Sequence, residues 1–277
     1  MNIFNKFSIL NAQLNKNYTT GLIPTMGALH KGHTSLIEKA LKENGQVIVS
    51  IFVNPTQFNN FEDLKKYPRT FDKDIKLIKD ISTKINVYSP KPKDLYNNKI
   101  QASIYKFDGL DSVMEGIYRP NHFQGVATIV ERLLWAFLPN NAYFGEKDFQ
   151  QIQIIKSLVG QKKIPTKIIS CPIIREKNGL AYSSRNTFLT KDQRNTCSLI
   201  FEQLNLAKKL LRNNSPEQIM KTIEKNFKKI SNLDLEYFDI RDEKNLSIVN
   251  KKTNKKIRAF IAAKIGKIRL IDNLSLY

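Results

Sequence analysis

The sequence has few of the residues that cross-link a chain or bind transition metals. Its 277 residues include only two cysteines, three histidines and one tryptophan. Cys171 and Cys197 lie far apart in apolar or helical surroundings, so we expect two buried, reduced thiols rather than a disulfide. The histidines and cysteines offer no third ligand at a zinc-like spacing. The sequence therefore argues against both a disulfide scaffold and a zinc centre.

Long apolar segments are also missing. No run approaches the roughly 20 apolar residues that a helix needs to span a bilayer. The first ten residues are too mixed in polarity for a secretory signal. A hydrophobic content of 41% nevertheless fits a globular chain rather than a disordered one. We therefore expect a cytoplasmic protein that does not enter a membrane.

Acidic residues are too few to balance the basic ones, and the net charge is +20. Such a charge is compatible with nucleic-acid binding. The lysines, however, are spread along the whole chain, and the basic runs carry little of the aromatic interleaving that stacks on bases. We interpret the excess of basic residues as the result of a biased composition, with the lysines solvated at the surface. We therefore expect no specific nucleic-acid partner.

The most informative stretch is residues 23–37, Ile-Pro-Thr-Met-Gly-Ala-Leu-His-Lys-Gly-His-Thr-Ser-Leu-Ile. The residues before it, 18–22, are rich in β-branched and apolar types, and apolar residues recur at helical spacing from Leu36 until Asn44. This pattern predicts a strand, a glycine-containing turn and a helix start. Unpaired N–H groups and the positive end of the helix dipole make such a junction suitable for an anion.

Two histidines strengthen this interpretation. His30 and His33 are three residues apart, so they share one face of the first helical turn and can donate hydrogen bonds to a phosphate. Gly27 and Gly32 allow a ligand to approach the backbone. Alternatively, histidines at a helix start can be ordinary surface residues or helix caps.

Other polar groups follow predicted strands. Residues 46–53 form a continuous apolar run typical of a buried parallel strand, and Gln57 follows at its carboxyl end, where α/β sheets bind ligands. A simple turn is the alternative for residues 54–58. Lys147 stands near a predicted helix start after a strand at 142–144, where a lysine is electrostatically unfavourable unless it binds an anion.

A third cluster, Ser183, Ser184 and Arg185, combines hydroxyls with a guanidinium and so suits phosphate. The alternative is a serine-capped loop in water. From residue 190 the pattern changes to longer polar helices, including one over 191–213, followed by strands at 235–240, 258–265 and 268–273. We also predict a strand at 104–107.

These elements predict an α/β fold with two domains. Residues 1–174 form a Rossmann-like parallel-sheet domain, and residues 175–277 form a smaller C-terminal α+β domain.

Four separated stretches, taken together, resemble the pantothenate synthetase (pantoate–β-alanine ligase) family. They are residues 24–33, 52–58, 144–151 and 183–186, which read PTMGALHKGH, FVNPTQF, FGEKDFQQ and SSRN. The resemblance covers nearly the whole chain and is densest over residues 22–190. This family belongs to the nucleotidylyl-transferases whose first motif is H-x-G-H, here residues 30–33.

The resemblance implies a two-step reaction in which pantoate is adenylated by ATP and the adenylate is then captured by β-alanine. It also implies Mg²⁺ held mainly by phosphate oxygens and water, a homodimer, and a C-terminal domain that acts as a lid. Some family members hold the metal with an acid near residues 71–74, but this segment contains a lysine here, so we assign no metal ligand. The alternative is another adenylyl-transferring enzyme of the same superfamily.

Site residues follow from the same resemblance. His33 is the expected proton donor to the departing pyrophosphate, with His30, Lys147 and Arg185 as the other catalytic groups. Gln57 and Gln151 are expected to hold pantoate. The residues expected to bind ATP are Met26, Gly27, Ala28, Leu29, His30, Lys31, Gly32, His33, Gly145, Glu146, Lys147, Asp148, Ile174, Tyr182, Ser183, Ser184 and Arg185.

Overall fold

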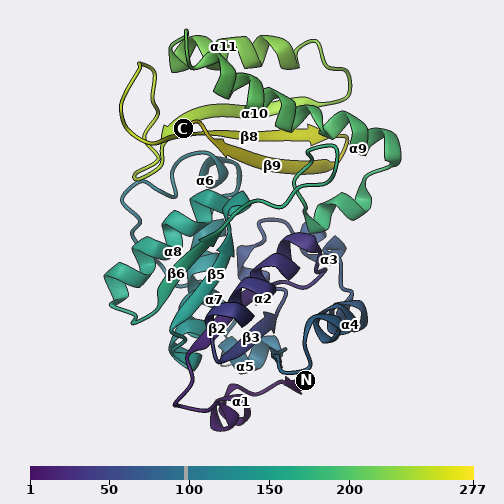
Figure 1. Ribbon diagram of the computed structural model, residues 1–277, viewed down its shortest axis with the longest axis vertical. Helices are drawn as coiled ribbons and strands as arrows, with labels where there is room; N and C mark the ends of the chain where they lie inside the picture. Colours follow the sequence, from purple (N-terminus) through teal and green to yellow (C-terminus); the bar gives the residue numbers. More distant parts are fainter. Residues whose placement is uncertain (97–98) are drawn as a thin grey trace. The chain divides into compact units, whose positions relative to one another are not determined.

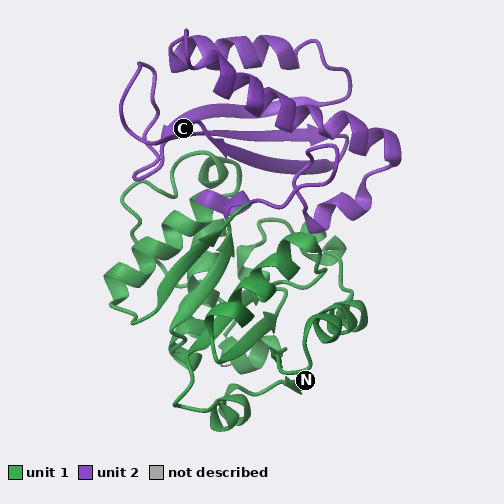
Figure 2. Cartoon of the chain, viewed as in Figure 1, with its two compact units in different colours: residues 1–145, 150–172 green, residues 146–149, 173–277 purple. Residues whose placement is uncertain are grey.

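The computed structural model describes residues 1–96 and 99–277, and these divide into two compact units (Figures 1 and 2). The first unit comprises Met1–Gly145 and Gln150–Pro172. The second comprises Glu146–Phe149 and Ile173–Tyr277. A four-residue segment therefore interrupts the first unit in sequence and packs with the second.

The first unit is built on a six-stranded sheet in the order β1-β4-β3-β2-β5-β6, with every neighbouring pair parallel. The strands are β1 (Asn2–Phe4), β2 (Thr20–Thr25), β3 (Gln46–Ile51), β4 (Asn86–Tyr88), β5 (Asn141–Gly145) and β6 (Lys167–Cys171). The helices are α1 (Phe7–Gln13), α2 (Lys31–Glu43), α3 (Phe61–Lys66), α4 (Phe71–Ile81), α5 (Pro92–Tyr96), α6 (Glu115–Tyr118), α7 (His122–Phe137) and α8 (Phe149–Lys162). The predicted Rossmann-like α/β fold is confirmed.

Both faces of this sheet are covered, and the strand residues alternate between two cores. Leu22 and Ile48 belong to a core that includes apolar residues of α7 and α8. Their neighbours Ile23 and Val49 belong to a separate core that includes residues of α2 and α4. Successive strand side chains point to opposite faces, so a strand covered on both sides must be apolar at every position. This explains the continuous apolar run of β3.

The strand order fixes where a ligand would bind in this unit. From β2 the chain moves outward through β3 to β4, and it returns to the other side of β2 with β5. The crevice outside the carboxyl ends of strands at such a reversal is the usual ligand site of open α/β sheets. The 26–33 stretch follows β2 directly, and so lies at this reversal.

The second unit contains a three-stranded antiparallel sheet in the order β7-β8-β9. Its strands are β7 (Asp234–Asp242), β8 (Ile257–Ile265) and β9 (Ile268–Ser275), and its α-helices are α9 (Lys191–Cys197), α10 (Leu199–Leu210) and α11 (Pro216–Phe227). Leu204 of α10, Ile223 of α11 and Ile261 of β8 are fully buried in one core. The predicted α+β character of this part of the chain is confirmed.

Two local predictions are wrong. Residues 104–107, which the structure describes, form no strand. Instead, the Gln124 side chain accepts from the Tyr105 N–H at 2.8 Å and donates to the Tyr105 carbonyl at 3.2 Å, replacing a strand partner. The single helix expected over 191–213 is two helices, α9 and α10, that meet at Ser198, whose hydroxyl donates to the Asn195 carbonyl at 2.7 Å.

The prediction of two buried thiols is confirmed, since Cys171 and Cys197 are both free and buried. Burial raises the pKa of Cys197 to about 11, which keeps this thiol protonated near neutral pH. Across residues 1–96 and 99–277, no helix combines the length and the apolar character required to cross a membrane.

Three buried tyrosines are expected to limit the stability of the first unit at alkaline pH. Burial, the largest cause at each site, raises the pKa of Tyr88, Tyr105 and Tyr143 to about 12. Each folded-state pKa lies above the unfolded value. The contribution of these protonated hydroxyls to the free energy of unfolding is therefore complete below about pH 10 and is lost as the pH rises through about 12. Tyrosinate absorbance should therefore show at least three of the ten tyrosines ionising only as the fold is lost. All ten ionising together near pH 10 in the folded protein would contradict the expectation.

Candidate active site

The turn after β2 holds Ala28 in a conformation that favours glycine. Gly27 has φ +76° and Ala28 has φ +49°, both in the left-handed region. Asp74 of α4 fixes this turn: its carboxylate accepts the backbone N–H of Ala28 at 2.9 Å and of Leu29 at 2.8 Å. The Thr70 hydroxyl donates to the same carboxylate at 3.1 Å. A buried acid 46 residues away in sequence from Ala28 therefore shapes the start of the H-x-G-H segment.

The sequence pattern did not identify the role of Asp74, which we considered only as part of the segment 71–74, where we assigned no metal ligand. One signal was present: Asp74 precedes Ile78 by four residues and so shares the buried face of α4. A carboxylate on an apolar helix face requires a partner. Nothing in the sequence pattern identified that partner as the turn after β2.

The two histidines close the first turn of α2 as reciprocal caps. His30 precedes the helix, and its Nδ1 accepts the backbone N–H of Gly32 at 3.1 Å. His33 Nδ1 accepts the backbone N–H of His30 at 3.3 Å. The two ring centroids are 4.1 Å apart. Because each Nδ1 accepts a hydrogen bond from a backbone N–H, a neutral ring carries its proton on Nε2, which makes Nε2 the donor atom.

The capping of the pair is compatible with the predicted anion contact. The imidazoles are helix caps, as the alternative held, and this capping fixes the tautomer in which both rings can donate to an anion. Lys31 and Gly32 lie in the same helical turn, at the positive end of α2.

Gln57 lies in the loop after β3, in a short 3₁₀ helix (Pro55–Gln57), and is buried. Its Nε2 donates to the Met26 sulfur at 3.0 Å, and its Oε1 accepts from Asn54 at 3.1 Å. Met26 and Gln57, predicted from separate stretches, are therefore in contact. A thioether sulfur is a weak acceptor, so a stronger acceptor on a ligand could replace it at little cost.

A buried network locks this loop. The Asn54 Oδ1 accepts from Tyr96 at 2.5 Å and from Thr56 at 3.0 Å, while its Nδ2 donates to the Gly125 carbonyl at 3.0 Å. A Cβ on Gly125 would lie 2.2 Å from the Thr56 carbonyl oxygen, so α7 and the loop pack at a distance that only glycine permits.

The third histidine reinforces the same loop. The Nδ1 of His122, at the start of α7, lies 2.8 Å from the Gln57 carbonyl oxygen, and its Nε2 lies 3.1 Å from Arg119 Nη1. Since an arginine only donates, Nε2 accepts and Nδ1–H donates to the carbonyl. His122 was not predicted as a site residue because only the fold brings it to Gln57.

The two glutamines at the start of α8 differ in burial. Gln150 is buried and uses its whole carboxamide within the unit, accepting from the Glu115 N–H at 3.1 Å and donating to the carbonyls of Leu110 and Val113 at 2.8 Å. Gln151, the residue predicted to bind substrate, is half-buried and lies one position further around the helix.

The predicted residues from Glu146 to Asp148 belong to the second unit. Gly145 ends β5 in the first unit, and Glu146, Lys147 and Asp148 then form a single 3₁₀ turn. The Lys147 ammonium is 3.3 Å from the Asp148 carboxylate. Lys147 therefore stands at the start of a helical segment, before α8, as the sequence pattern predicted.

The segment 174–185, also in the second unit, is folded back on itself. The Tyr182 N–H donates to the Ile174 carbonyl at 3.0 Å, which brings together two predicted residues that are separated in sequence. Ser183 caps the next 3₁₀ helix, Ser184–Phe188, by accepting the Arg185 N–H at 3.3 Å. Ser184 is buried. Ser183 is therefore a helix cap, as the capped-loop alternative described, and the cap uses only the acceptor capacity of its hydroxyl.

A doubly wound parallel sheet with an H-x-G-H helix start at its strand reversal defines a Rossmann-like α/β protein of the nucleotidylyl-transferase type. Comparison with known proteins identifies the family. The family model described as Pantoate-beta-alanine ligase matches residues 2–275, so the chain belongs to the pantoate–β-alanine ligase family. It is a ligase by that membership.

Individual relatives match over most or all of their length. A pantothenate synthetase from Flavobacterium psychrophilum is 51% identical over 259 residues, covering 93% of this chain and 92% of the relative. The crystal structure of pantothenate synthetase from Thermus thermophilus superposes with a TM-score of 0.94 at 32% identity, covering 100% of both chains. A pantoate–β-alanine ligase from Francisella tularensis, described as complexed with beta-gamma ATP and β-alanine, has a TM-score of 0.81 at 38% identity, covering 100% of this chain and 98% of that one.

Proposed function

We propose that this chain joins pantoate to β-alanine in an ATP-dependent ligation that releases AMP and pyrophosphate. The observation that carries the proposal is the family match over residues 2–275 of the 277-residue chain. The capped histidine pair at the carboxyl edge of the parallel sheet supports the proposal, because its Nε2 atoms can donate to phosphate oxygens.

The proposed reaction has two steps. A carboxylate oxygen of pantoate attacks the α-phosphorus of ATP, and the bond to the bridging oxygen of the β-phosphate breaks, releasing pyrophosphate. The β-alanine amine then attacks the acyl carbon, AMP leaves with the C–O electron pair, and the amine loses a proton. Both steps depend mainly on alignment and on neutralising negative charge.

We assign the first unit to phosphate and pantoate binding. The Nε2 donors of His30 and His33 contact phosphate oxygens, with His33 protonating the departing pyrophosphate. Residues 26–32 contribute backbone N–H groups, and Gly27 and Gly32 allow the ligand to approach the backbone closely. Gln57 exchanges its contact with the Met26 sulfur for a pantoate oxygen, and Gln151 contributes a second carboxamide.

We assign nucleotide contacts in the second unit to the 146–148 turn and to residues 174–185. Lys147 and Arg185 neutralise phosphate charge, Asp148 accepts from a ribose hydroxyl, and Ser183 and Ser184 contribute hydroxyls. Ile174 and Tyr182 line the nucleotide, as does Gly145 at the end of β5. The functional division proposed is residues 1–174 for ATP and pantoate, with residues 175–277 as a lid.

The residues present fit a magnesium ion that is carried by the nucleotide. Within residues 1–96 and 99–277, no group of three or more histidine, cysteine, aspartate or glutamate side chains could hold a metal ion. Asp74, the buried acid nearest the phosphate-binding turn, already accepts two backbone N–H groups and a hydroxyl. Mg²⁺ is therefore assigned to phosphate oxygens and water, where it would neutralise the charge of the triphosphate.

The test is product analysis of the purified chain with ATP, Mg²⁺ and pantoate. Pyrophosphate exchange into ATP should require pantoate, and free AMP should appear at a high rate only when β-alanine is added. Glycine and γ-aminobutyrate serve as control amines that differ in length. An adenylyl group that stays on the product, with no free AMP, would favour the alternative of another adenylyl-transferring enzyme and contradict the proposal.

We also propose a cytoplasmic homodimer. The support is family membership together with exposed apolar side chains of the first unit, such as Ile104, Trp135 and Leu138, which are 93%, 48% and 52% exposed. Light scattering in solution tests the dimer, since it should give about twice the chain mass of 32.0 kDa.

A further inference from the structure

Two successive residues of β9, Asp272 and Asn273, are buried polar groups that the proposed mechanism does not use. Asp272 is 4% exposed and Asn273 is 1% exposed. They pair with Ile261 and Phe260 of β8, so they lie within a regular antiparallel sheet. The Asp272 carboxylate also accepts the Asn273 N–H at 2.8 Å. Polar side chains this deeply buried require partners, and those partners lie in two functional segments.

Asn273 holds the 146–148 turn by its backbone. Its carboxamide nitrogen donates to the carbonyl oxygens of Glu146 at 2.8 Å and Lys147 at 2.9 Å. Its Oδ1 accepts from Arg258 Nη1 at 2.6 Å. One buried side chain therefore fixes two consecutive peptide groups of the turn that carries Lys147.

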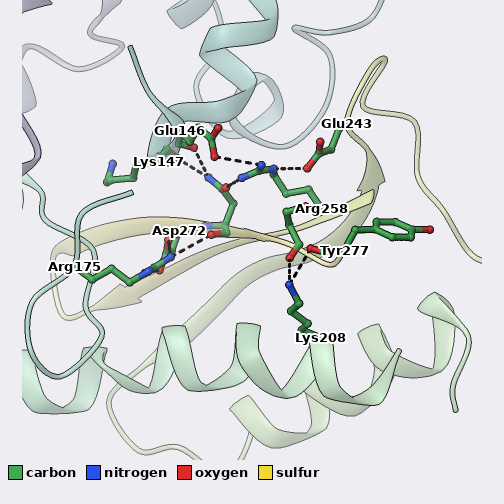
Figure 3. Close-up of polar contacts among 10 residues, drawn as sticks. Glu146, Lys147, Arg175, Lys208, Glu243, Arg258, Asp272 and Tyr277 are labelled. Carbon is green, nitrogen blue, oxygen red and sulfur yellow. Dashed lines mark hydrogen bonds and ion pairs between the residues drawn. The ribbon is translucent and has the colours of Figure 1, made fainter. Parts of the chain in front are cut away.

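Arg258 of β8 supports the same turn through side-chain contacts (Figure 3). Its Nη2 lies 3.4 Å from the Glu146 carboxylate, and its guanidinium carbon lies 4.1 Å from the centre of the Phe149 ring. Its Nε donates to Glu243 at 2.9 Å, which orients the guanidinium. The contacts of Arg258 and Asn273 therefore involve the side chains of Glu146 and Phe149 and the backbone carbonyls of the turn. The side chains of Lys147 and Asp148 contact each other instead.

Asp272 holds the other segment. Arg175 donates to its two carboxylate oxygens at 2.5 and 3.0 Å, and Figure 3 shows the two side chains facing each other. Arg175 also donates to the Gly179 carbonyl at 3.1 Å and lies 3.8 Å from the centre of the Phe201 ring. Burial raises the pKa of the Asp272 carboxyl, while Arg175 and the Asn273 N–H act in the opposite direction.

The Arg175 contact fixes the segment that leads to the serine–arginine turn. Arg175 and Ala181 form an antiparallel bridge, and the Tyr182 N–H donates to the Ile174 carbonyl. Ser183 to Arg185 follow directly. The contact between Arg175 and β9 therefore fixes the position from which residues 182–185 extend. The same strand holds the turn that carries Lys147.

We propose that Asp272 and Asn273 are a pair of positioning residues that set the 146–148 turn and the 174–185 segment at a fixed separation for the adenylation step. The proposal rests on the proposed function. A hydrogen-bonded strand is a rigid reference, and two charged groups that act on one triphosphate lose efficiency when either moves by a fraction of an ångström. The pair acts through Lys147 and Arg185, and so differs from a residue that contributes only to stability.

The test measures pantoate-dependent ATP–pyrophosphate exchange in Asn273→Asp and Asp272→Asn. Asn273→Asp keeps the side-chain shape but removes both donors to the carbonyls of the turn. Asp272→Asn keeps the shape but removes the charge that pairs with Arg175. Each should lower kcat for exchange by about ten- to a hundredfold at saturating ATP, with KM for pantoate changed by less than about threefold.

Arg269→Ala is the matched control. Arg269 lies on the same strand and forms an ion pair with Glu236 of β7 at 2.6 Å, so its loss weakens the same sheet while leaving the contacts of Asp272 and Asn273 in place. It should keep kcat within about twofold of the wild type, whatever its effect on the thermal midpoint. Asn273→Ala replaces the aspartate variant if the latter does not fold.

The outcomes separate the two proposals. An exchange-active wild type whose folded Asn273 and Asp272 variants behave like Arg269→Ala would overturn the positioning role and leave the function standing. A wild type that shows no pantoate-dependent exchange would overturn the proposed function, and the positioning role with it.

Discussion

His33→Ala and Lys147→Ala are each expected to reduce pantoyl-adenylate formation by about a hundredfold or more, the scale of losing one preorganised donor to transition-state charge. The charge on the departing pyrophosphate develops in the first step, so the defect should fall on kcat for that step. Pyrophosphate release from ATP and pantoate, measured without β-alanine, isolates it.

Both variants should remain folded. The side chain of His33 accepts one N–H at the start of α2, and the loss of such a cap costs only about 0.5–2 kcal/mol. The Lys147 side chain pairs with the half-exposed Asp148, and the turn itself is held through its backbone by Asn273. Lys42→Ala, at an exposed position near the end of α2, is the charge-matched control and should release pyrophosphate like the wild type. Unchanged release in both active-site variants would refute the assignment.

Asp74→Ala is expected to damage both the fold and nucleotide binding. The substitution leaves the N–H groups of Ala28 and Leu29 without their acceptor at a buried site, which costs about 2–4 kcal/mol of unfolding free energy. The left-handed conformation of Ala28 is unfavourable for a residue with a Cβ, so the turn should relax once the carboxylate is gone. ATP affinity should fall by at least about tenfold.

Denaturant unfolding and calorimetric ATP titration measure the two effects separately. Asp74→Asn keeps one acceptor oxygen and should give an intermediate loss of both. Asp80→Ala, at an exposed position of the same helix, is the control and should match the wild type. An Asp74→Ala protein with wild-type stability and ATP affinity would show that the turn does not depend on this carboxylate.

Local sequence patterns predicted elements whose residues lie close together in the chain. The apolar run of β3 and the helical spacing after Leu36 report burial directly, because the period of apolar residues follows the geometry of a strand or a helix. The same patterns failed at residues 104–107, where the side chain of Gln124 takes the place of a neighbouring strand. Only Tyr105 and Phe107 of this segment are buried. Alternating burial is therefore compatible with a segment that joins no sheet.

The sequence by itself determined the parallel α/β sheet, the strand–turn–helix around His30 and His33, the buried thiols and the resemblance to the ligase family. Only the tertiary structure decided what holds those groups in place: Asp74 on the turn after β2, Asn54 and His122 on the Gln57 loop, and the Asp272–Asn273 pair beneath the 146–148 turn. Apart from the local bond between Asn54 and Gln57, these contacts join residues more than 40 positions apart, including the bonds from Asn54 to Gly125 and to Tyr96. A single sequence contains the apolar periodicity that predicts each helix or strand. Contacts between elements depend on the strand order and on how the helices pack, and no local pattern indicates which distant residues these bring together.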